Sequence, residues 1–192
     1  MKYQLRDYQK KASDAAVMCF KMKSGRNGLL VLPTGAGKSL IIADIAARLE
    51  EPLIVFQPNK EILEQNFAKL QTYGIWDCSI YSASVGRKEI SRITFATIGS
   101  VIRHMKDFQH FKNILIDECH LVKPSDGMYK RFFEQAERRI VGLTATPYRL
   151  YSCMNGSMLK FLTRTRPRVF SQVLYYCQVS ELLAKGFLSR LK

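Results

Sequence analysis

Long apolar runs, paired cysteines and acidic residues are what this sequence has little of. No apolar stretch approaches the ~18 residues that a membrane-spanning helix needs, so we expect no membrane span. The opening residues, Met1 to Arg6, form no apolar signal core, so we expect no secretion signal. The five cysteines are widely separated and form no CxxC pair, which argues against a zinc site and a disulfide scaffold. We therefore expect buried free thiols in a reducing, cytoplasmic environment.

The chain also lacks internal repeats and low-complexity tracts. Its 192 residues suffice for one domain with a substantial core, or for one domain plus a connecting segment. A hydrophobic share of 47% and a charged share of 24% are ordinary for a soluble globular protein.

Acidic residues are strongly outnumbered by basic ones. There are 30 Lys and Arg against 16 Asp and Glu, which gives a formal net charge of +14. Residues 160–192 alone carry seven basic residues against one acidic residue, Glu181. An excess of this size favours a polyanionic partner, most often nucleic acid. A solvated basic surface is the alternative that composition alone leaves open.

A glycine-rich loop, LPTGAGKS, occupies residues 32–39. It follows a short apolar run and opens a periodic apolar segment, which is the strand–loop–helix context of a phosphate-binding loop. Gly35 and Gly37 permit tight turns that point backbone N–H groups at an anion, next to the positive end of the helix. Lys38 would reach the β- and γ-phosphates of a nucleotide, and the Ser39 hydroxyl would hold Mg²⁺. Leu32 departs from the strict motif, which has glycine at that position.

Short apolar runs alternate with helical patterns along most of the chain. These predict helices over 4–23, 40–49, 60–74, 98–105, part of 125–137 and 179–185, and strands near 29–32, 53–57, 77–81, 93–96, 114–117, 139–144 and 174–177. The strands are apolar throughout, as is typical of strands buried on both faces of a parallel sheet. We therefore predict an α/β fold, a three-layer α/β/α domain with a mainly parallel central sheet. Residues 82–92 read as a loop or short helix, and 148–172 as an exposed, mobile loop with a turn at 155–157.

Polar clusters follow the predicted strands at 33–39, 57–59, 97–100, 117–120 and 144–147. Ligands of such sheets bind at the carboxyl ends of the strands, so the clusters predict one shared site or groove. Asp117 would hold Mg²⁺ through water, and Glu118 would orient the attacking water. His120 is placed to link the carboxylate to Thr144 or Thr146. Turns, helix caps and structural hydrogen bonds are the plainer interpretations of each cluster taken alone.

A possible base reader lies near the N-terminus, in LRDYQ at residues 5–9. The amide of Gln9 can bond both N6 and N7 of adenine, which would select ATP over GTP. Spacing alone favours an ordinary helix start.

Taken together, these stretches resemble the first RecA-like domain of superfamily 2 nucleic-acid helicases and translocases, the DEAD/DEAH-like group. In that family the first loop position is often not glycine, so Leu32 is no obstacle. The matching stretches are LRDYQ (5–9, adenine-reading motif), LPTGAGKS (32–39, motif I), FQPN (56–59, motif Ia), ATIGS (96–100, motif Ib), DECH (117–120, motif II) and TATP (144–147, motif III). TATPYR followed by ELLAKGFLS is most similar to RadD-type repair helicases and to the motor subunits of restriction enzymes, including type III.

The resemblance implies a role for each matching residue. ATP and Mg²⁺ would be the cofactors, and the residues that would bind them are Arg6, Gln9, Thr34, Gly35, Ala36, Gly37, Lys38, Ser39 and Asp117. The resemblance also implies catalytic roles for Lys38, Asp117, Glu118 and His120, and coupling roles for Thr144 and Thr146. Gln57, Pro58, Asn59 and Thr97 would line a groove for a single strand, mainly through phosphates, with DNA favoured over RNA.

The resemblance also shows what is missing from residues 1–192. The family's motor has a second RecA-like domain that carries an arginine finger, and nothing after Pro147 resembles it. We expect 148–192 to be a basic loop and segment leading toward that domain, and this piece alone to bind and hydrolyse ATP weakly. The alternatives are a restriction-enzyme motor subunit, a nucleotide-gated nucleic-acid-binding module without productive hydrolysis, and a P-loop kinase, against which the DECH and TATP pair argues.

Overall fold

The computed structural model describes residues 4–22, 26–123, 127–153 and 156–188. An eight-stranded sheet runs through it in the order β10-β1-β7-β6-β2-β5-β3-β4. Every pairing in this sheet is parallel except that of β3 with β4. The strands of the sheet are β1 (Gly28–Val31), β2 (Leu53–Phe56), β3 (Cys78–Ser82), β4 (Arg87–Lys88), β5 (Ile93–Ala96), β6 (Asn113–Ile116), β7 (Arg139–Thr144) and β10 (Gln172–Tyr176).

Helices connect most of the strands. The α-helices are α1 (Asp7–Lys21), α2 (Lys38–Arg48), α3 (Lys60–Thr72), α4 (Ile98–Val101), α5 (Met128–Phe133) and α6 (Val179–Ala184), and the 3₁₀ helices are η1 (Met105–Phe108), η2 (Cys119–Leu121) and η3 (Leu162–Arg164). Asn59 caps α3, because its side chain accepts a hydrogen bond from the Ile62 N–H at 2.9 Å. Among the helices in the described ranges, none combines the length and apolar character needed to cross a membrane.

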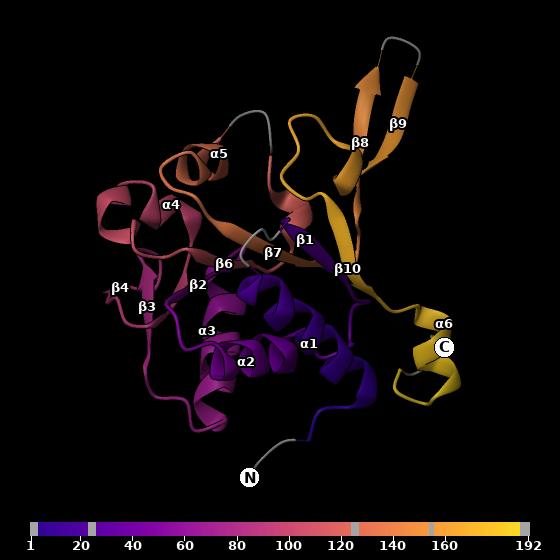
Figure 1. Ribbon diagram of the computed structural model, residues 1–192, viewed down its shortest axis with the longest axis horizontal. Helices are drawn as coiled ribbons and strands as arrows, with labels where there is room; N and C mark the ends of the chain where they lie inside the picture. Colours follow the sequence, from indigo (N-terminus) through magenta and orange to yellow (C-terminus); the bar gives the residue numbers. More distant parts are fainter. Residues whose placement is uncertain (1–3, 23–25, 124–126, 154–155, 189–192) are drawn as a thin grey trace.

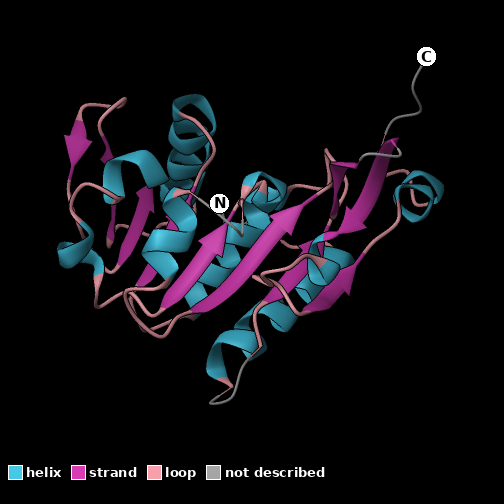
Figure 2. Ribbon diagram, turned by 90° about the horizontal axis from the view of Figure 1, so that it is seen from above, coloured by secondary structure: helices cyan, strands magenta, loops and turns pink. Residues whose placement is uncertain are grey.

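The central strands separate two layers of helices. α1, α2 and α3 lie on one side of the sheet, and α4 and α5 lie on the other (Figures 1 and 2). Successive residues of β1 show why both sides must be covered: Leu30 packs in the core under α1 to α3, whereas Leu29 and Val31 pack in the core on the opposite side. The predicted three-layer α/β fold with a mainly parallel sheet is confirmed.

Several predicted boundaries differ from the observed ones. In place of the helix expected over 98–105, α4 ends at Val101 and a separate 3₁₀ turn, η1, begins at Met105. The stretch 82–92 contains the short strand β4 instead of only a loop. The helix expected over 4–23 extends from 7 to 21, and its predicted end at residue 23 lies outside the described residues. The same holds for residue 125, the predicted start of the region that contains α5.

The expectation of a loop over 148–172 was wrong for most of this stretch, although residues 165–171 form no helix or strand, as expected. Residues Tyr148–Cys153 (β8) and Gly156–Phe161 (β9) pair antiparallel as a separate two-stranded hairpin, and η3 follows it. Both of its faces meet solvent, so its sequence has no alternation of buried and exposed residues that would predict strands. Residue 155 of the predicted turn lies outside the described residues.

The prediction of buried free thiols is confirmed for three of the cysteines and not for Cys78. Cys19, Cys119 and Cys177 are buried free thiols, and Cys78 is a free thiol of intermediate exposure. Burial raises the pKa of the Cys119 thiol, which keeps it protonated and unreactive.

Candidate functional site

The glycine loop joins β1 to α2 at the carboxyl edge of the sheet. Gly35 and Gly37 both adopt left-handed conformations, with φ values of 81° and 74°. A Cβ atom on Gly37 would lie 2.5 Å from Nε2 of Gln9, so space as well as backbone conformation requires glycine there. The Leu32 N–H donates to the Thr144 carbonyl at 3.0 Å, which ties the start of the loop to the end of β7.

The start of α1 holds the loop from behind. The Tyr8 hydroxyl and the Gln9 amide nitrogen both donate to the Ala36 carbonyl, at 3.0 and 2.9 Å. Oε1 of Gln9 accepts from the Arg6 N–H at 3.0 Å, and the Gln9 side chain is only 3% exposed. The Gln9 amide, which was predicted to bind adenine, is therefore hydrogen-bonded to the phosphate loop in this structure. The Arg6 guanidinium lies 4.3 Å from the ring centre of Phe187.

The acidic pair follows β6, two strands away from β1 in the sheet. Lys38 Nζ forms an ion pair with Oε1 of Glu118, although the two residues are 80 positions apart. Glu118 has a φ of 48°, and it is the one non-glycine residue with positive φ in the described ranges. Such a conformation costs about 1–3 kcal/mol and is typical of functional sites.

Asp117 is buried, with 6% exposure. Burial raises the pKa of its carboxyl group and Glu118 adds to the rise, while the nearby Lys38 ammonium opposes it. Oδ1 accepts from the Glu118 N–H at 3.0 Å, and Oδ2 accepts from the Asn66 amide at 3.3 Å. A carboxylate whose charge is disfavoured by burial is a suitable partner for a cation.

The residues present fit a Mg²⁺ ion that is bound together with a nucleotide. No cluster of three His, Cys, Asp or Glu side chains that could hold a metal occurs in the described part of the chain. Mg²⁺ keeps several waters and is usually bound through one or two carboxylates plus substrate phosphates, so it needs no such cage. Asp117 and the Ser39 hydroxyl are the residues that could serve as protein ligands in that arrangement.

His120 connects the acidic pair to β7. Its Nδ1 atom lies 3.0 Å from the Thr144 hydroxyl and 3.2 Å from Oε2 of Glu118. Thr144 is fully buried, and its hydroxyl also accepts from the Thr146 N–H at 3.0 Å. The polar contacts of this one His120 nitrogen therefore link Glu118 to the end of β7.

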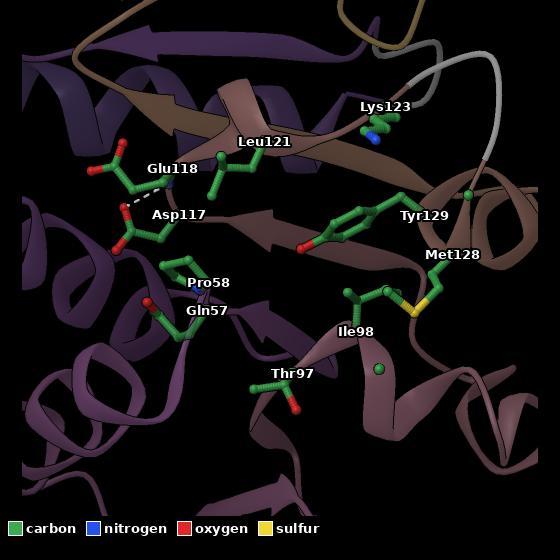
Figure 3. A pocket seen from close by; sticks show the side chains of 12 residues that line it. Gln57, Pro58, Thr97, Ile98, Asp117, Glu118, Leu121, Lys123, Met128 and Tyr129 are labelled. Carbon is green, nitrogen blue, oxygen red and sulfur yellow. Dashed lines mark hydrogen bonds between the residues drawn. The ribbon is translucent and has the colours of Figure 1, made fainter. Parts of the chain in front are cut away.

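A cavity of about 480 Å³ opens beside the acidic pair. Figure 3 shows Asp117 and Glu118 at one end, with Gln57, Pro58 and Thr97 along the lower side. Its full lining is Gln57, Pro58, Thr97, Ile98, Gly99, Asp117, Glu118, Leu121, Lys123, Gly127, Met128 and Tyr129. The structure thus brings three of the four predicted nucleic-acid residues and both predicted acids into one cavity.

The fourth predicted nucleic-acid residue, Asn59, does not line this cavity, because its side chain caps α3. Gln57 accepts from the Asn66 amide at 3.1 Å, while its own amide nitrogen is buried without a hydrogen-bond partner in the structure. The Thr97 hydroxyl lies within 3.2 Å of Ser82 and 3.0 Å of Ser100.

Sequence reasoning missed several residues that shape the site. Asn66 contacts both Asp117 and Gln57, and its signal was a polar residue on the apolar face of α3, next to Phe67. Gly142 gives room to Cys119, since a Cβ atom there would lie 2.6 Å from its sulfur. That contact joins β7 to the acidic-pair loop and has no local signal in the sequence.

A parallel α/β sheet with a glycine loop after β1 and an acidic pair after β6 defines a RecA-like P-loop domain of the superfamily 2 type. Residues 2–149 match the family model described as "Type III restriction enzyme, res subunit". The chain belongs to this family.

Curated relatives carry helicase and translocase names. The chain is 29% identical over 151 residues to the DNA 3'-5' translocase XPB2 of Sulfurisphaera tokodaii, covering 77% of this chain and 32% of that protein. It is 29% identical over 154 residues to the DNA 3'-5' helicase XPB of Mycobacterium tuberculosis, covering 75% of this chain and 27% of that protein. The chain therefore spans about a third of the length of these relatives.

Solved structures agree on the fold. The DNA-bound type ISP restriction-modification enzyme LlaBIII superposes with a TM-score of 0.74 at 16% identity, covering all of this chain and 16% of that one. The Sulfolobus solfataricus SWI2/SNF2 ATPase core in complex with double-stranded DNA gives 0.61 at 22% identity, covering 77% of this chain and 33% of that one. At these identities the likeness concerns the fold alone.

Proposed function

We propose that this chain is the N-terminal ATP-binding motor domain of an ATP-dependent helicase or translocase that acts on nucleic acid, DNA in preference to RNA. The ion pair between Lys38 and Glu118 carries the proposal, because it joins the phosphate loop to the acidic pair across 80 residues. In a P-loop hydrolase these two positions must meet around the terminal phosphate.

The phosphate loop would bind the triphosphate of ATP. Backbone N–H groups of Thr34 to Ser39 and the positive end of α2 would hold its oxygens, and Lys38 would leave Glu118 to contact the terminal phosphates. Ser39 and Asp117 would hold Mg²⁺, which when bound neutralises charge that develops on the phosphates.

Glu118 would act as the group that orients the attacking water and accepts its proton. Its release from Lys38 on nucleotide binding would free one carboxylate oxygen for that water. The polar contacts of His120 with Glu118 and Thr144, and of Thr144 with Thr146, would report the state of Glu118 to β7, which is the coupling role proposed for these residues. Arg6 and Gln9 would contact the adenine base, and in that role the Gln9 amide would share its hydrogen bonds between Ala36 and the base.

The cavity beside the acidic pair supports a nucleic-acid track. Gln57, Pro58 and Thr97 would contact phosphates along it, and Asn59 would contribute through its position at the start of α3. Phosphate contacts position a strand without reading its sequence, so binding should be salt-sensitive and sequence-tolerant.

We infer that the complete motor includes a second RecA-like domain, because the chain spans about a third of its curated relatives. An arginine finger from such a domain contributes about 10³–10⁵ in rate in related NTPases. This chain alone should therefore hydrolyse ATP poorly. Substantial unwinding by these 192 residues would contradict the proposal.

The family match favours one alternative: the motor subunit of a restriction enzyme. A nuclease domain elsewhere in the same protein would support it. The other alternative is a nucleotide-gated binding module, which a longer protein with ATPase activity unchanged by nucleic acid would support.

The test is calorimetric titration of the chain with ATP in Mg²⁺ and in EDTA. Lys38→Ala should abolish measurable ATP binding, and chelation of Mg²⁺ should weaken binding to the unmodified chain. Lys112→Ala removes an exposed lysine from the opposite edge of the sheet and should leave affinity unchanged. Equal affinity of the Lys38→Ala and Lys112→Ala proteins would overturn the assignment of the loop.

A further inference from the structure

The β8–β9 hairpin carries an unpartnered apolar face. Cross-strand pairing places Tyr148 opposite Phe161 and Leu150 opposite Leu159, so these four side chains share one face of the ribbon. Their exposures are 42%, 49%, 66% and 61%, respectively. Figure 1 shows the two strands extending beyond the rest of the ribbon, with no element covering them. An isolated two-stranded hairpin with this exposure is marginally stable in water, which indicates a surface made for contact.

The surroundings of this face are basic. No Asp or Glu occurs between Glu137 and Glu181 in the sequence, whereas seven Lys and Arg do. Lys160 lies on the opposite face of this narrow ribbon, with its ammonium 5.1 Å from the ring centre of Tyr151. Arg164 and Arg166 follow in and after η3, are exposed, and form no ion pair with a described residue. An excess of basic residues of this kind complements a polyanion such as nucleic acid.

In the turn after the hairpin, Arg164 and Arg166 are exposed because the residues next to them, Leu162 and Thr165, are buried and hold the turn in place. Leu162 and Thr165 are each 4% exposed, and the Thr165 hydroxyl donates to the Leu162 carbonyl at 2.9 Å. The Leu162 N–H donates to the Pro147 carbonyl at 2.8 Å, which fixes the turn against the base of the hairpin. Arg168 is a different case, because it lines a cavity together with Glu134 and Glu137.

The base of the hairpin adjoins the acidic-pair loop. The Arg149 side chain donates to the His120 carbonyl, and the next residue, Leu121, is 56% exposed and lines the strand-end cavity. The hairpin therefore adjoins the acidic-pair loop through Arg149, while Tyr148 and Phe161 at its base line a separate cavity beside Pro33.

We propose that residues 148–153 and 156–166 form a second nucleic-acid-binding surface, in which Lys160, Arg164 and Arg166 contact phosphates and the apolar face contacts bases of a single strand. Sites of this class combine a cationic path with side chains against which unpaired bases pack. The proposal rests on the proposed function for its class of partner, but it requires no nucleotide and no hydrolysis.

The test is fluorescence anisotropy of a short labelled single-stranded DNA, titrated with the chain in the absence of nucleotide at several salt concentrations. The triple variant Lys160→Ala/Arg164→Ala/Arg166→Ala should weaken binding at least about tenfold and reduce the slope of log affinity against log salt by about 2. The control Lys21→Ala/Arg26→Ala/Lys112→Ala removes the same charge from exposed positions at the opposite edge of the sheet and should leave the affinity nearly unchanged. Equal losses in the two triple variants would overturn the proposal.

The apolar face is tested separately with Leu150→Ser/Leu159→Ser. This variant should bind the oligonucleotide about three- to tenfold more weakly, with an unchanged salt slope, because it removes apolar contact and no charge. Met18→Ser/Met22→Ser is the matched control, since those methionines are 68% and 51% exposed on and just after α1. If the leucine variant changes self-association in sedimentation but not oligonucleotide affinity, the face is a protein interface and the proposal fails. Lys38→Ala should bind the oligonucleotide normally, so failure of the ATP site and failure of this surface are distinguishable.

Discussion

Residues 5–147 and the β8–β9 hairpin (Tyr148–Cys153 and Gly156–Phe161) are built on different principles. In the first region the polar groups of the site are buried and bonded to one another, as with Ala36, Asp117 and Thr144. In the second, every residue of β9 is exposed, and the charges lie at the surface. The family match ends at residue 149, the second residue of β8. The first region is stabilised by its own buried interior, whereas the hairpin exposes its side chains to solvent.

A leucine-to-alanine substitution should reduce the free energy of unfolding far more in the first region than in the hairpin, and this is the largest difference we expect. Leu143 in β7 is fully buried, so Leu143→Ala should lower the free energy of unfolding by about 2–5 kcal/mol. Leu159 in β9 is 61% exposed, so Leu159→Ala should change it by less than about 0.5 kcal/mol. Urea denaturation followed by circular dichroism measures both. Similar losses would show that the hairpin is part of the core.

Glycine at the phosphate loop can be compared with glycine elsewhere at the same backbone angle. Gly37 and Gly74 have φ values of 74° and 77°, but only at Gly37 would a Cβ atom meet another group, the Gln9 amide. Both alanine variants should lose about 1–2 kcal/mol of stability from left-handed backbone strain. Gly37→Ala alone should also weaken ATP binding, by about tenfold or more, because it displaces the amide that holds the loop. Unchanged ATP affinity in Gly37→Ala would show that this contact does not shape the site.

The Arg149 side chain joins the base of the hairpin to the loop that carries the acidic pair. Arg149→Met removes its hydrogen bond to the His120 carbonyl and should cost about 1 kcal/mol of stability. ATP affinity should stay the same, while the change in oligonucleotide affinity on adding a non-hydrolysable ATP analogue should shrink. Arg103→Met, at an exposed position with no described ion pair, is the control. A full nucleotide-dependent change in Arg149→Met would separate the hairpin from the ATP site.

The sequence was sufficient for features that local pattern determines. Uninterrupted apolar runs identified the central strands of the sheet, because strands buried on both faces need apolar residues at every position. The strand-end rule placed Lys38, Asp117, Glu118, His120 and Thr144 at one edge, and the structure brings them together.

The remaining features depend on contacts between distant positions. The Tyr8 hydroxyl and the Ala36 carbonyl are 28 positions apart, and Asn66 and Asp117 are 51 apart. No local pattern reports such a bond. The hairpin was not predicted for a different reason. Strands exposed on both faces show no alternation of apolar and polar residues, so the sequence of 148–161 was interpreted as a loop.

The most direct measurement is single-turnover hydrolysis of ATP by Glu118→Gln, together with its ATP affinity, beside Glu137→Gln as an exposed control of equal charge change. The account predicts that Glu118→Gln binds ATP at least as tightly as the unmodified chain, since Lys38 loses its ion-pair partner and is free for the phosphates. It also predicts that the bound ATP stays intact, while Glu137→Gln retains the slow turnover of the unmodified chain. Turnover by Glu118→Gln at the unmodified rate would show that Glu118 does not orient the attacking water.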